Sequence, residues 1–129
     1  MEPDNDAFFS LCNTISQLRS QNGCPWDQKQ TVKSLRKYFR EECEELIEAM
    51  SENNPPHLCE EIGDVLFHLI LLSEISAESG HFAIEDVIKG INDKMMRRHP
   101  HVFANSPMGD EEELKKQWKK IKSLEKKKK

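Results

Sequence analysis

Apolar residues recur at spacings of three and four along most of this chain, which is the period of an α-helix. The first such segment, residues 7–18, has one apolar face, formed by Phe8, Leu11, Ile15 and Leu18. Asp6 could cap this helix, and Asn22-Gly23 would stop it. No segment shows the apolar–polar alternation of a β-strand, so the pattern predicts an all-α protein.

The same spacing predicts four more helices, and their apolar positions differ in breadth. The second helix would run from a cap at Thr31 to about Glu52, the third from about Pro56 to Ser79, the fourth over residues 84–98 and the fifth over residues 111–126. Their apolar positions are Leu35, Phe39, Cys43, Leu46 and Met50 in the second, Leu58, Ile62, Val65, Leu66, Leu69, Ile70 and Leu72 in the third, and Leu114, Trp118, Ile121 and Leu124 in the fifth.

The connections between these helices indicate a bundle of about five helices. Residues 24–27 and 99–103 are predicted as loops, and Gly80 would end the third helix. The short Asn53-Asn54-Pro55-Pro56 link makes the second and third helices antiparallel neighbours at the core. A length of 129 residues predicts one domain over residues 1–129, with a frayed basic tail at about 127–129.

Cysteine usage and the apolar runs point to a cytoplasmic protein. The four cysteines form no C-x-x-C pair, and the start Met1-Glu2-Pro3-Asp4 lacks the basic region of a signal peptide, so reduced thiols are expected. The longest apolar run, residues 65–72, is too short for a bilayer. A zinc site formed by these cysteines, with His57, His99 and His101 as further ligands, is the competing idea, but the chain has no tight ligand pair.

Charge is distributed unevenly along the chain. Residues 1–110 contain ten Lys and Arg against nineteen Asp and Glu, whereas residues 111–129 contain nine Lys and four Glu. Between Glu41 and Ile88 there are thirteen carboxylates and no Lys or Arg. Neighbouring helical carboxylates repel one another, so this stretch should have a cationic partner.

Two carboxylate pairs in this stretch have the spacing of a metal site. Glu42 and Glu45 lie about 60° apart on the second helix, as do Glu61 and Asp64 on the third. If the two helices pack together, these pairs would form a ring of oxygen ligands suited to Mg²⁺. Gly63 would keep the site uncrowded, and His68 could border it, although a structural role suits His68 better. The competing interpretation is a solvated acidic face, to which we assign Glu44, Glu48 and Glu52.

Cations and an aromatic residue follow the acidic stretch and suit a polyphosphate. Lys94 and Arg98 share a helix face. With Lys89 and Arg97 they are the first cations after the acidic stretch, and Lys and Arg side chains beside a metal could hold phosphate oxygens. Trp118 could stack on a nucleobase, with Lys122 as a phosphate contact. The alternatives remain open: helix-dipole complementation for the cations, and core packing for Trp118.

Five ordered motifs strongly resemble the MazG family of all-α nucleoside triphosphate pyrophosphohydrolases. They are Cys24-Pro25-Trp26-Asp27-x-x-Gln30-Thr31; Glu41-Glu42-x-x-Glu45; Glu60-Glu61-Ile62-Gly63-Asp64; Asn92-Asp93-Lys94 with Arg97-Arg98-His99-Pro100-His101-Val102-Phe103; and Trp118-x-x-Ile121-Lys122. The resemblance extends from about residue 8 to 125. It implies a MazG-like helical bundle and Mg²⁺-dependent cleavage of a nucleoside triphosphate to the monophosphate and pyrophosphate, with Mn²⁺ as a possible substitute.

The resemblance also implies roles for individual residues. It carries metal binding onto Glu42, Glu45, Glu61 and Asp64, with Glu41 as a helper and our candidate for the general base. It carries substrate contacts onto Lys94, Arg98, Trp118 and Lys122. Residues 24–27 could lie near a base pocket or simply fix the loop that enters the second helix. Well-known members contain two tandem copies of this domain, whereas this chain contains one.

Several alternatives to a general triphosphate pyrophosphohydrolase remain. One is a narrower substrate, such as a deoxynucleotide or a phosphoribosyl-nucleotide, and another is a non-catalytic helical interaction protein with a degenerate site. Nucleic-acid binding through the terminal lysines is weakly supported, because the chain has a net charge of -4. The broad apolar surface of the third helix predicts a homodimer or larger homo-oligomer.

Overall fold

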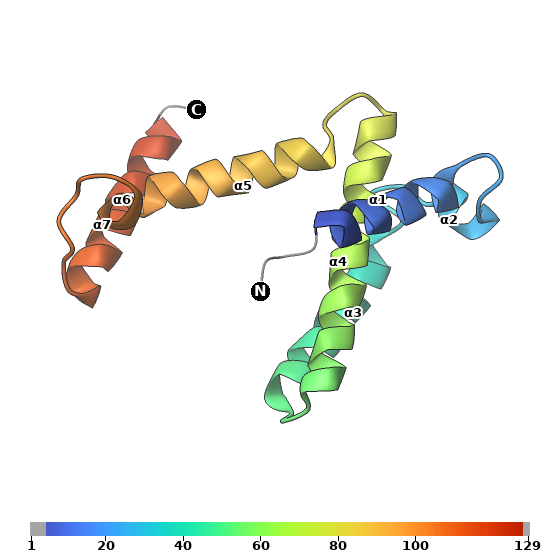
Figure 1. Ribbon diagram of the computed structural model, residues 1–129, viewed down its shortest axis with the longest axis horizontal. Helices are drawn as coiled ribbons and strands as arrows, with labels where there is room; N and C mark the ends of the chain where they lie inside the picture. The colour runs from blue at the N-terminus through green and yellow to red at the C-terminus, as the bar shows by residue number, and fades with distance from the viewer. Residues whose placement is uncertain (1–4, 128–129) are drawn as a thin grey trace. The chain divides into compact units, whose positions relative to one another are not determined.

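The computed structural model describes residues 5–127, and all regular structure in this range is helical (Figure 1). The helices are α1 (Asn5–Arg19), α2 (Pro25–Lys29), α3 (Arg36–Ser51), α4 (Pro55–Glu78), α5 (Ile84–Arg98), α6 (Pro100–Phe103) and α7 (Glu111–Lys127). The all-α class is therefore confirmed. The chain forms two compact units, one ending at Ile84 and the other starting at Glu85, and the single domain stays a prediction.

The observed boundaries differ from the predicted ones in a few places. α1 begins at Asn5, so Asp6 lies in its first turn instead of capping it. The two predicted loops contain the short helices α2 and α6, each of which begins at a proline, because the fixed φ of proline suits a first helical turn. Of the predicted frayed tail, Lys127 belongs to α7, while Lys128 and Lys129 lie outside the described residues.

Helix α3 begins later than the position of Thr31 predicts. Thr31 Oγ1 accepts a hydrogen bond from the Ser34 backbone N–H (3.0 Å), and Ser34 Oγ accepts one from the Thr31 N–H (2.8 Å). This reciprocal pair closes a turn and satisfies backbone donors in the manner of a capping box. The chain therefore makes one tight turn before the α-helix starts at Arg36.

Two glycines end helices for different reasons. A Cβ on Gly23 would lie 2.3 Å from the carbonyl oxygens of Gln17 and Leu18, so only glycine allows the chain to turn this closely after α1. Gly80 follows α4 with φ of 74°. There the His81 N–H donates to the Ser76 carbonyl and the Gly80 N–H to the Ala77 carbonyl, which is the Schellman arrangement.

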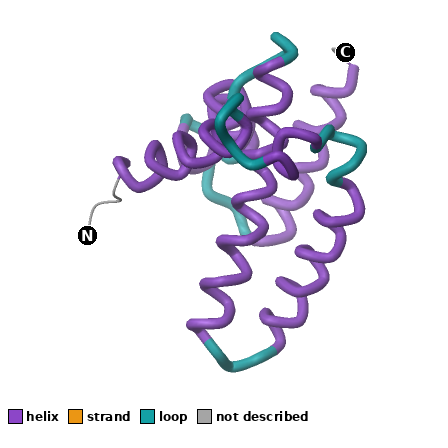
Figure 2. Tube along the Cα trace, turned by 90° about the vertical axis from the view of Figure 1, so that its right-hand side faces the viewer, coloured by secondary structure: helices purple, strands orange, loops and turns teal. Residues whose placement is uncertain are grey.

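The core of the first unit lies where α1, α3 and α4 meet. Figure 2 shows α3 and α4 as an antiparallel pair joined by a short loop, as predicted, and α1 packs on α4 and α2. The buried core consists of Ile15, Leu35, Ile70, Leu71 and Ile75. Phe8 and Leu11 of α1 pack against this core, which confirms the predicted apolar face of α1.

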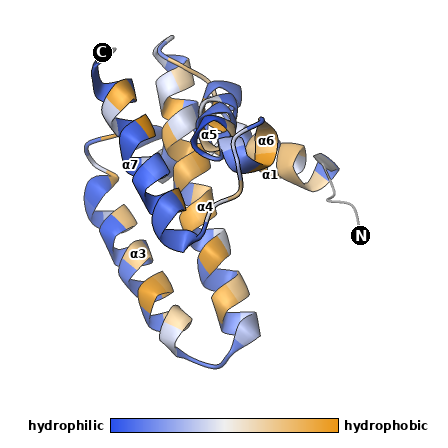
Figure 3. Ribbon diagram, turned by 90° about the vertical axis from the view of Figure 1, so that its left-hand side faces the viewer, coloured by the Kyte–Doolittle hydropathy of each residue, from blue (hydrophilic) through white to orange (hydrophobic). Residues whose placement is uncertain are grey.

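Some predicted core positions are exposed. In α3, Met50 is exposed and the neighbouring Ala49 is fully buried, so the buried side of α3 near its end includes Ala49 instead of Met50. In α4, where hydrophobic residues recur along the helix (Figure 3), Ile62, Leu66 and Leu69 are 51%, 38% and 45% exposed. Only part of the broad apolar surface of α4 is therefore covered within the first unit.

Arg19 ties α2 to the rest of the first unit. Its Nε and Nη2 donate to the two carboxylate oxygens of Glu78 at the end of α4 (3.0 and 2.6 Å). Its Nη1 donates to the carbonyl oxygens of Asp27 and Gln30 (2.7 Å each), which lie at the end of α2. Charged hydrogen bonds of this kind are stronger than neutral ones, so the segment entering α3 is firmly held.

In the second unit, two ion pairs link α5 to α7. Arg97 Nε donates to Glu125 Oε2 (2.5 Å), and Arg98 Nη2 donates to Glu125 Oε1 (2.9 Å). The hydrogen bonds from Arg98 and Arg97 lower the pKa of Glu125 to about 2. No described residue of α5, α6 or α7 is fully buried within this unit.

Among the described residues, 5–127, no helical segment combines the length and the apolar composition that spanning a membrane requires.

The loop between α3 and α4 is fixed by Asn54 and His57. Asn54 Oδ1 accepts the N–H of His57 and so caps α4 (3.3 Å). The two ring nitrogens of His57 face Glu52 Oε2 (2.7 Å) and Glu61 Oε1 (3.2 Å). Only the doubly protonated imidazolium can donate to both carboxylates.

We predict that His57 makes the stability of the metal-free protein depend on pH. The hydrogen bond to Glu52, together with the charges of Glu52 and Glu61, raises the pKa of His57. A raised pKa means that protonated His57 stabilises the folded state below about pH 6.5, the unfolded value, and that this contribution is lost as pH rises through the folded pKa. We therefore expect His57→Gln to lower the free energy of unfolding, relative to the parent protein, by more at about pH 6 than at about pH 8.5. Urea unfolding in the presence of EDTA would measure this difference.

His81→Gln is the matched control, because the His81 ring makes no hydrogen bond or ion pair among the described residues and lies in the same unit. Its unfolding free energy should follow that of the parent protein across this pH range. An equal loss for His57→Gln at both pH values would contradict the charge-based role of His57.

Candidate metal and nucleotide sites

Four carboxylates of α3 and α4 come together in the first unit, as their spacing predicts. One oxygen each from Glu42, Glu45, Glu61 and Asp64 lies within 4.8 Å of the others. Two pairs at i and i+3 face each other because α3 and α4 pack side by side and antiparallel. One metal ion could therefore be reached by an oxygen from each of the four side chains.

The burial of these carboxylates favours a cation between them. Glu61 is buried, and Glu42 Oε2 and Glu61 Oε2 are buried oxygens without a hydrogen-bond partner. Burial raises the pKa of Glu42, and the negative charges of Glu45 and Asp64 raise it further. An unpaired buried carboxylate is costly, and oxygen-rich acidic sets suit hard divalent cations. The residues present therefore fit a hard divalent cation.

Two histidines border this cluster and orient its members. The His57 ring lies within hydrogen-bond distance of Glu61 Oε1, whereas Oε2 of the same carboxylate has no hydrogen-bond partner. His68 is buried, and its Nδ1 donates to the Asp64 carbonyl oxygen (3.1 Å). The His68 ring also contacts Phe39 and Phe67, with centroids 6.4 and 5.6 Å away. His68 therefore has the structural role that we favour from the sequence.

Two other predictions near the cluster have different outcomes. Glu41 is exposed and lies one turn before Glu45 on the same face of α3. Its part in the reaction stays a prediction. Gly63 was expected to prevent crowding, but a Cβ there would meet no atom within 4 Å. This expectation is wrong for the described chain, because Gly63 lies on an exposed side of α4 and not between the ligands.

The second unit contains a separate cavity of about 420 Å³ between α5, α6 and α7. Trp118 lines it together with Arg98, His99 and His101. The Arg98 guanidinium lies 5.1 Å from the Trp118 ring centroid, and the His99 ring lies 5.2 Å from it. His101 Nδ1 is buried without a hydrogen-bond partner. An aromatic ring beside a cation and an unpaired ring nitrogen offers both a stacking surface and polar groups of the kind that a nucleobase requires.

The remaining predicted contacts lie near this cavity along the helices. Lys94 is half-buried on α5, one turn before Arg98, and Lys122 is exposed on α7, one turn after Trp118. Arg98 and Trp118 are therefore brought together, while Lys94 and Lys122 are not among the cavity-lining residues. The substrate roles of all four stay predictions.

Sequence reasoning missed the partners of two predicted residues. Glu125, which pairs with Arg98, is one of four glutamates in a lysine-rich segment and carries no motif. The sequence suggests His57 only as a further zinc ligand, although in the structure it pairs with Glu52 and Glu61 inside the acid-only stretch. Its position four residues before Glu61 on the same helix was a usable signal, because i and i+4 side chains are neighbours.

Comparison with known proteins supports one family. The family model described as the MazG nucleotide pyrophosphohydrolase domain matches residues 30–103, which contain the four clustered carboxylates, Lys94 and Arg98. Trp118 and Lys122 lie beyond the matched region.

Individual relatives agree with this match. The chain is 49% identical over 122 residues to the nucleoside triphosphate pyrophosphohydrolase/pyrophosphatase MazG of Thermotoga maritima, covering 95% of this chain and 46% of that protein. It is 49% identical over 119 residues to the uncharacterized protein YabN of Bacillus subtilis, covering 92% of this chain and 24% of that protein. It is 37% identical over 116 residues to the nucleoside triphosphate pyrophosphohydrolase of Escherichia coli K12, covering 89% and 44% of the two chains.

These curated relatives are longer, and the chain spans less than half of their length. A solved structure is matched almost completely: the mazG-related protein from Thermotoga maritima, with a TM-score of 0.73, 30% identity, and coverage of 89% of this chain and 98% of that one. Sequence, family model and structure agree, and this chain belongs to the MazG family.

Proposed function

We propose that this protein is a divalent-metal-dependent pyrophosphohydrolase that converts nucleoside triphosphates to monophosphates and pyrophosphate. The observation that carries the proposal is the set of four carboxylates within 4.8 Å of one another, with two buried oxygens that lack partners. The names of the relatives as nucleoside triphosphate pyrophosphohydrolases support the substrate class.

The residues of this chain divide the work as follows. Glu42, Glu45, Glu61 and Asp64 would hold Mg²⁺, for which Mn²⁺ could substitute. When bound, this ion would neutralise triphosphate charge and lower the pKa of a water molecule. His57 would keep Glu61 oriented, and Glu41 would accept a proton during hydrolysis. Lys94, Arg98 and Lys122 would hold phosphate oxygens, and Trp118 would stack on the base.

The direct test measures pyrophosphate release from a panel of ribo- and deoxynucleoside triphosphates, with Mg²⁺ and with EDTA. Release of pyrophosphate and monophosphate only with the metal would support the proposal. Release of orthophosphate, or release that is unaffected by EDTA, would contradict it. We also keep the prediction of a cytoplasmic location; none of the four cysteines forms a disulfide.

Replacement of a metal ligand should abolish turnover without harming the fold. We predict that Glu61→Gln and Asp64→Asn each lower kcat at least ~10²-fold, since the metal is central to this chemistry. In EDTA the melting temperature of Asp64→Asn should hold or rise, because a charge that repels Glu42 is removed. Glu61→Gln also removes a charge that repels Glu42, but it loses the ion pair with His57, so its gain should be smaller. Glu48→Gln, an exposed carboxylate of α3 outside the cluster, is the control and should keep the parent rate.

Lys94 should contribute to binding of the triphosphate but not of the metal. Loss of one charged hydrogen bond to phosphate predicts that Lys94→Ala weakens affinity for a non-hydrolysable nucleotide by about 2 kcal/mol. Separate calorimetric titrations with Mg²⁺ and with nucleotide would measure both. Lys89→Ala, on the same helix and paired with Asp93, should change neither. Unchanged nucleotide affinity in Lys94→Ala would reduce Lys94 to a helix-end charge.

Self-association is the expected state of the protein. Ile62, Leu66 and Leu69 are exposed along one side of α4, and such a patch favours a second subunit as its cover. Light scattering coupled to size exclusion should give at least twice the chain mass of 15.0 kDa. Leu66→Glu should yield monomers, whereas Val32→Glu, at a position that is 51% exposed elsewhere in the same unit, should not. A monomeric, fully active parent protein would refute this expectation.

A further inference from the structure

A cationic stretch lies directly before the acid-only stretch and has no part in the proposed reaction. From Gln28 to Arg40 the chain contains five Lys and Arg residues and no carboxylate. These are Lys29, Lys33, Arg36, Lys37 and Arg40, half of the ten cations in residues 1–110. The rest of residues 1–110 is strongly acidic, so positive charge is concentrated in this one stretch, where like charges this close repel one another.

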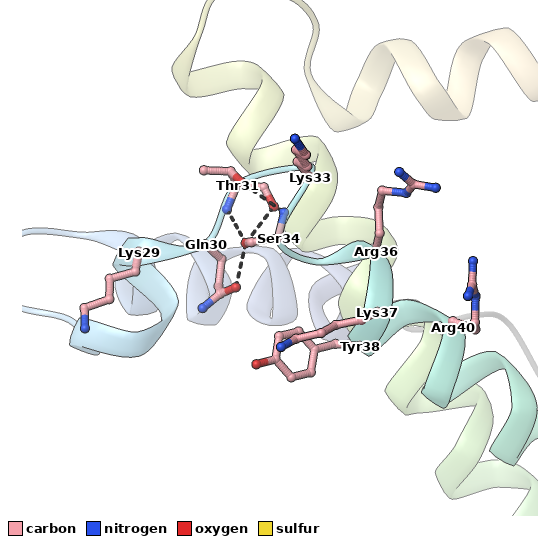
Figure 4. A pocket seen from close by; sticks show the side chains of 9 residues that line it. All are labelled: Lys29, Gln30, Thr31, Lys33, Ser34, Arg36, Lys37, Tyr38 and Arg40. Atoms are coloured by element: carbon pink, nitrogen blue, oxygen red, sulfur yellow. Dashed lines mark hydrogen bonds between the residues drawn. The ribbon is translucent and has the colours of Figure 1, made fainter.

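These five cations line one hollow of about 830 Å³, between the end of α2 and the first turns of α3. Figure 4 shows Arg36 and Arg40 projecting from the same side of α3, Lys33 projecting from the preceding turn, and Lys29 at the end of α2. Tyr38 adds an aromatic ring to the lining. A hollow of this volume is in the range of small-molecule sites.

The floor of the hollow is rigid. Gln30 is buried, its Nε2 donates to the Trp26 carbonyl oxygen (3.0 Å), and its Oε1 accepts from Ser34 Oγ (2.7 Å). The Thr31–Ser34 pair closes the turn above it (Figure 4). Arg19 holds the carbonyl oxygens of Asp27 and Gln30 from behind. The cations therefore project from a fixed backbone and not from a mobile loop.

Within residues 5–127 none of the five cations makes an ion pair. Lys37 Nζ lies 4.9 Å from the Tyr38 ring centroid, which is a cation–π contact and leaves its charge uncompensated. Of the other five cations in residues 1–110, four are paired with carboxylates: Arg19 with Glu78, Lys89 with Asp93, and both Arg97 and Arg98 with Glu125. The cations of the hollow therefore have no carboxylate partner among the described residues, unlike most other cations of residues 1–110.

The hollow is separate from the carboxylate cluster. At about 100° per residue, the centre of Arg36, Lys37 and Arg40 lies about 160° around α3 from the centre of Glu42 and Glu45. The two sites therefore occupy nearly opposite faces of one helix, and an anion in the hollow would not contact a metal held by the carboxylates.

We propose that this hollow binds a short polyphosphate anion, either inorganic or the phosphate chain of a nucleotide. Adjacent phosphates match a set of unpaired Lys and Arg side chains, and arginine can bind phosphate oxygens in pairs. The ligand is short, because a long polyanion that continued along α3 would meet exposed Glu41, Glu44 and Glu48. Binding needs neither a metal nor the carboxylate cluster, so the proposal is independent of the proposed activity.

Calorimetric titration of the full chain in EDTA tests this proposal, with tripolyphosphate and a nucleoside triphosphate as separate probes. The double variant Lys33→Glu/Arg36→Glu should bind at least about 10-fold more weakly than the parent. Raising NaCl from about 0.1 M to about 1 M, which shortens the Debye length from about 10 Å to about 3 Å, should also weaken binding by the parent. Both positions are exposed, so the fold should persist, as circular dichroism would verify.

Lys126→Glu/Lys127→Glu is the matched control, since it changes the net charge equally at exposed positions of α7. A second readout is the fluorescence of Trp26, whose ring lies 5.3 Å from Tyr38, in a Trp118→Phe background. If both probes bind, the hollow recognises the phosphate chain itself. If only the nucleotide binds, and the double variant loses this binding, the ligand is a nucleotide. Equal affinities of double variant and control, no binding of either probe, or tighter binding of a single-stranded oligonucleotide would overturn the proposal.

Discussion

Mutual repulsion of carboxylates between α3 and α4 is the constraint on which the first unit depends. Four acids have oxygens within 4.8 Å of one another, and Glu61 is buried among them. Without a cation this arrangement opposes folding, because each buried negative charge raises the cost of the next. The packing of α1 on α4, the buried core around Leu71 and the capped loop at Asn54 must therefore hold the two helices together against that repulsion.

The chain relieves this repulsion only in part. His57 places a proton between Glu52 and Glu61, and Arg19 neutralises Glu78 at the far end of α4. Neither reaches the unpartnered oxygens of Glu42 and Glu61. Lys and Arg are absent from Glu41 to Ile88, yet five of them gather immediately before it. In α3 the positive residues occupy the first turns and the carboxylates follow them. The metal-type carboxylates and the cations also lie on nearly opposite faces of the helix, so one face suits a cation and the other an anion.

Periodicity and spacing were sufficient for most of the fold and for the carboxylate cluster. Glu42, Glu45, Glu61 and Asp64 could be brought together from the sequence because i,i+3 spacing and a short antiparallel connection are local rules. Residues that pair across long distances could not: Glu125 lies 27 residues after Arg98, and only the folded chain brings their side chains together. The exposure of Met50 and the burial of Ala49 likewise depend on which side of α3 the rest of the unit covers, and an apolar stripe does not fix this to a single residue.

The state of Arg98 places a physical condition on any phosphate role for it. Its guanidinium donates twice to Glu125 Oε1 and lies against Trp118, with its side chain only 11% exposed. A phosphate oxygen at this guanidinium must therefore either use the remaining N–H groups or displace Glu125, whose carboxylate is also held by Arg97. Lys94 and Lys122 have no such competitor among the described residues, so they offer positive charge at lower cost. The phosphate role proposed for Arg98 is thus limited to its remaining N–H groups, while its contact with Trp118 also shapes the cavity that both residues line.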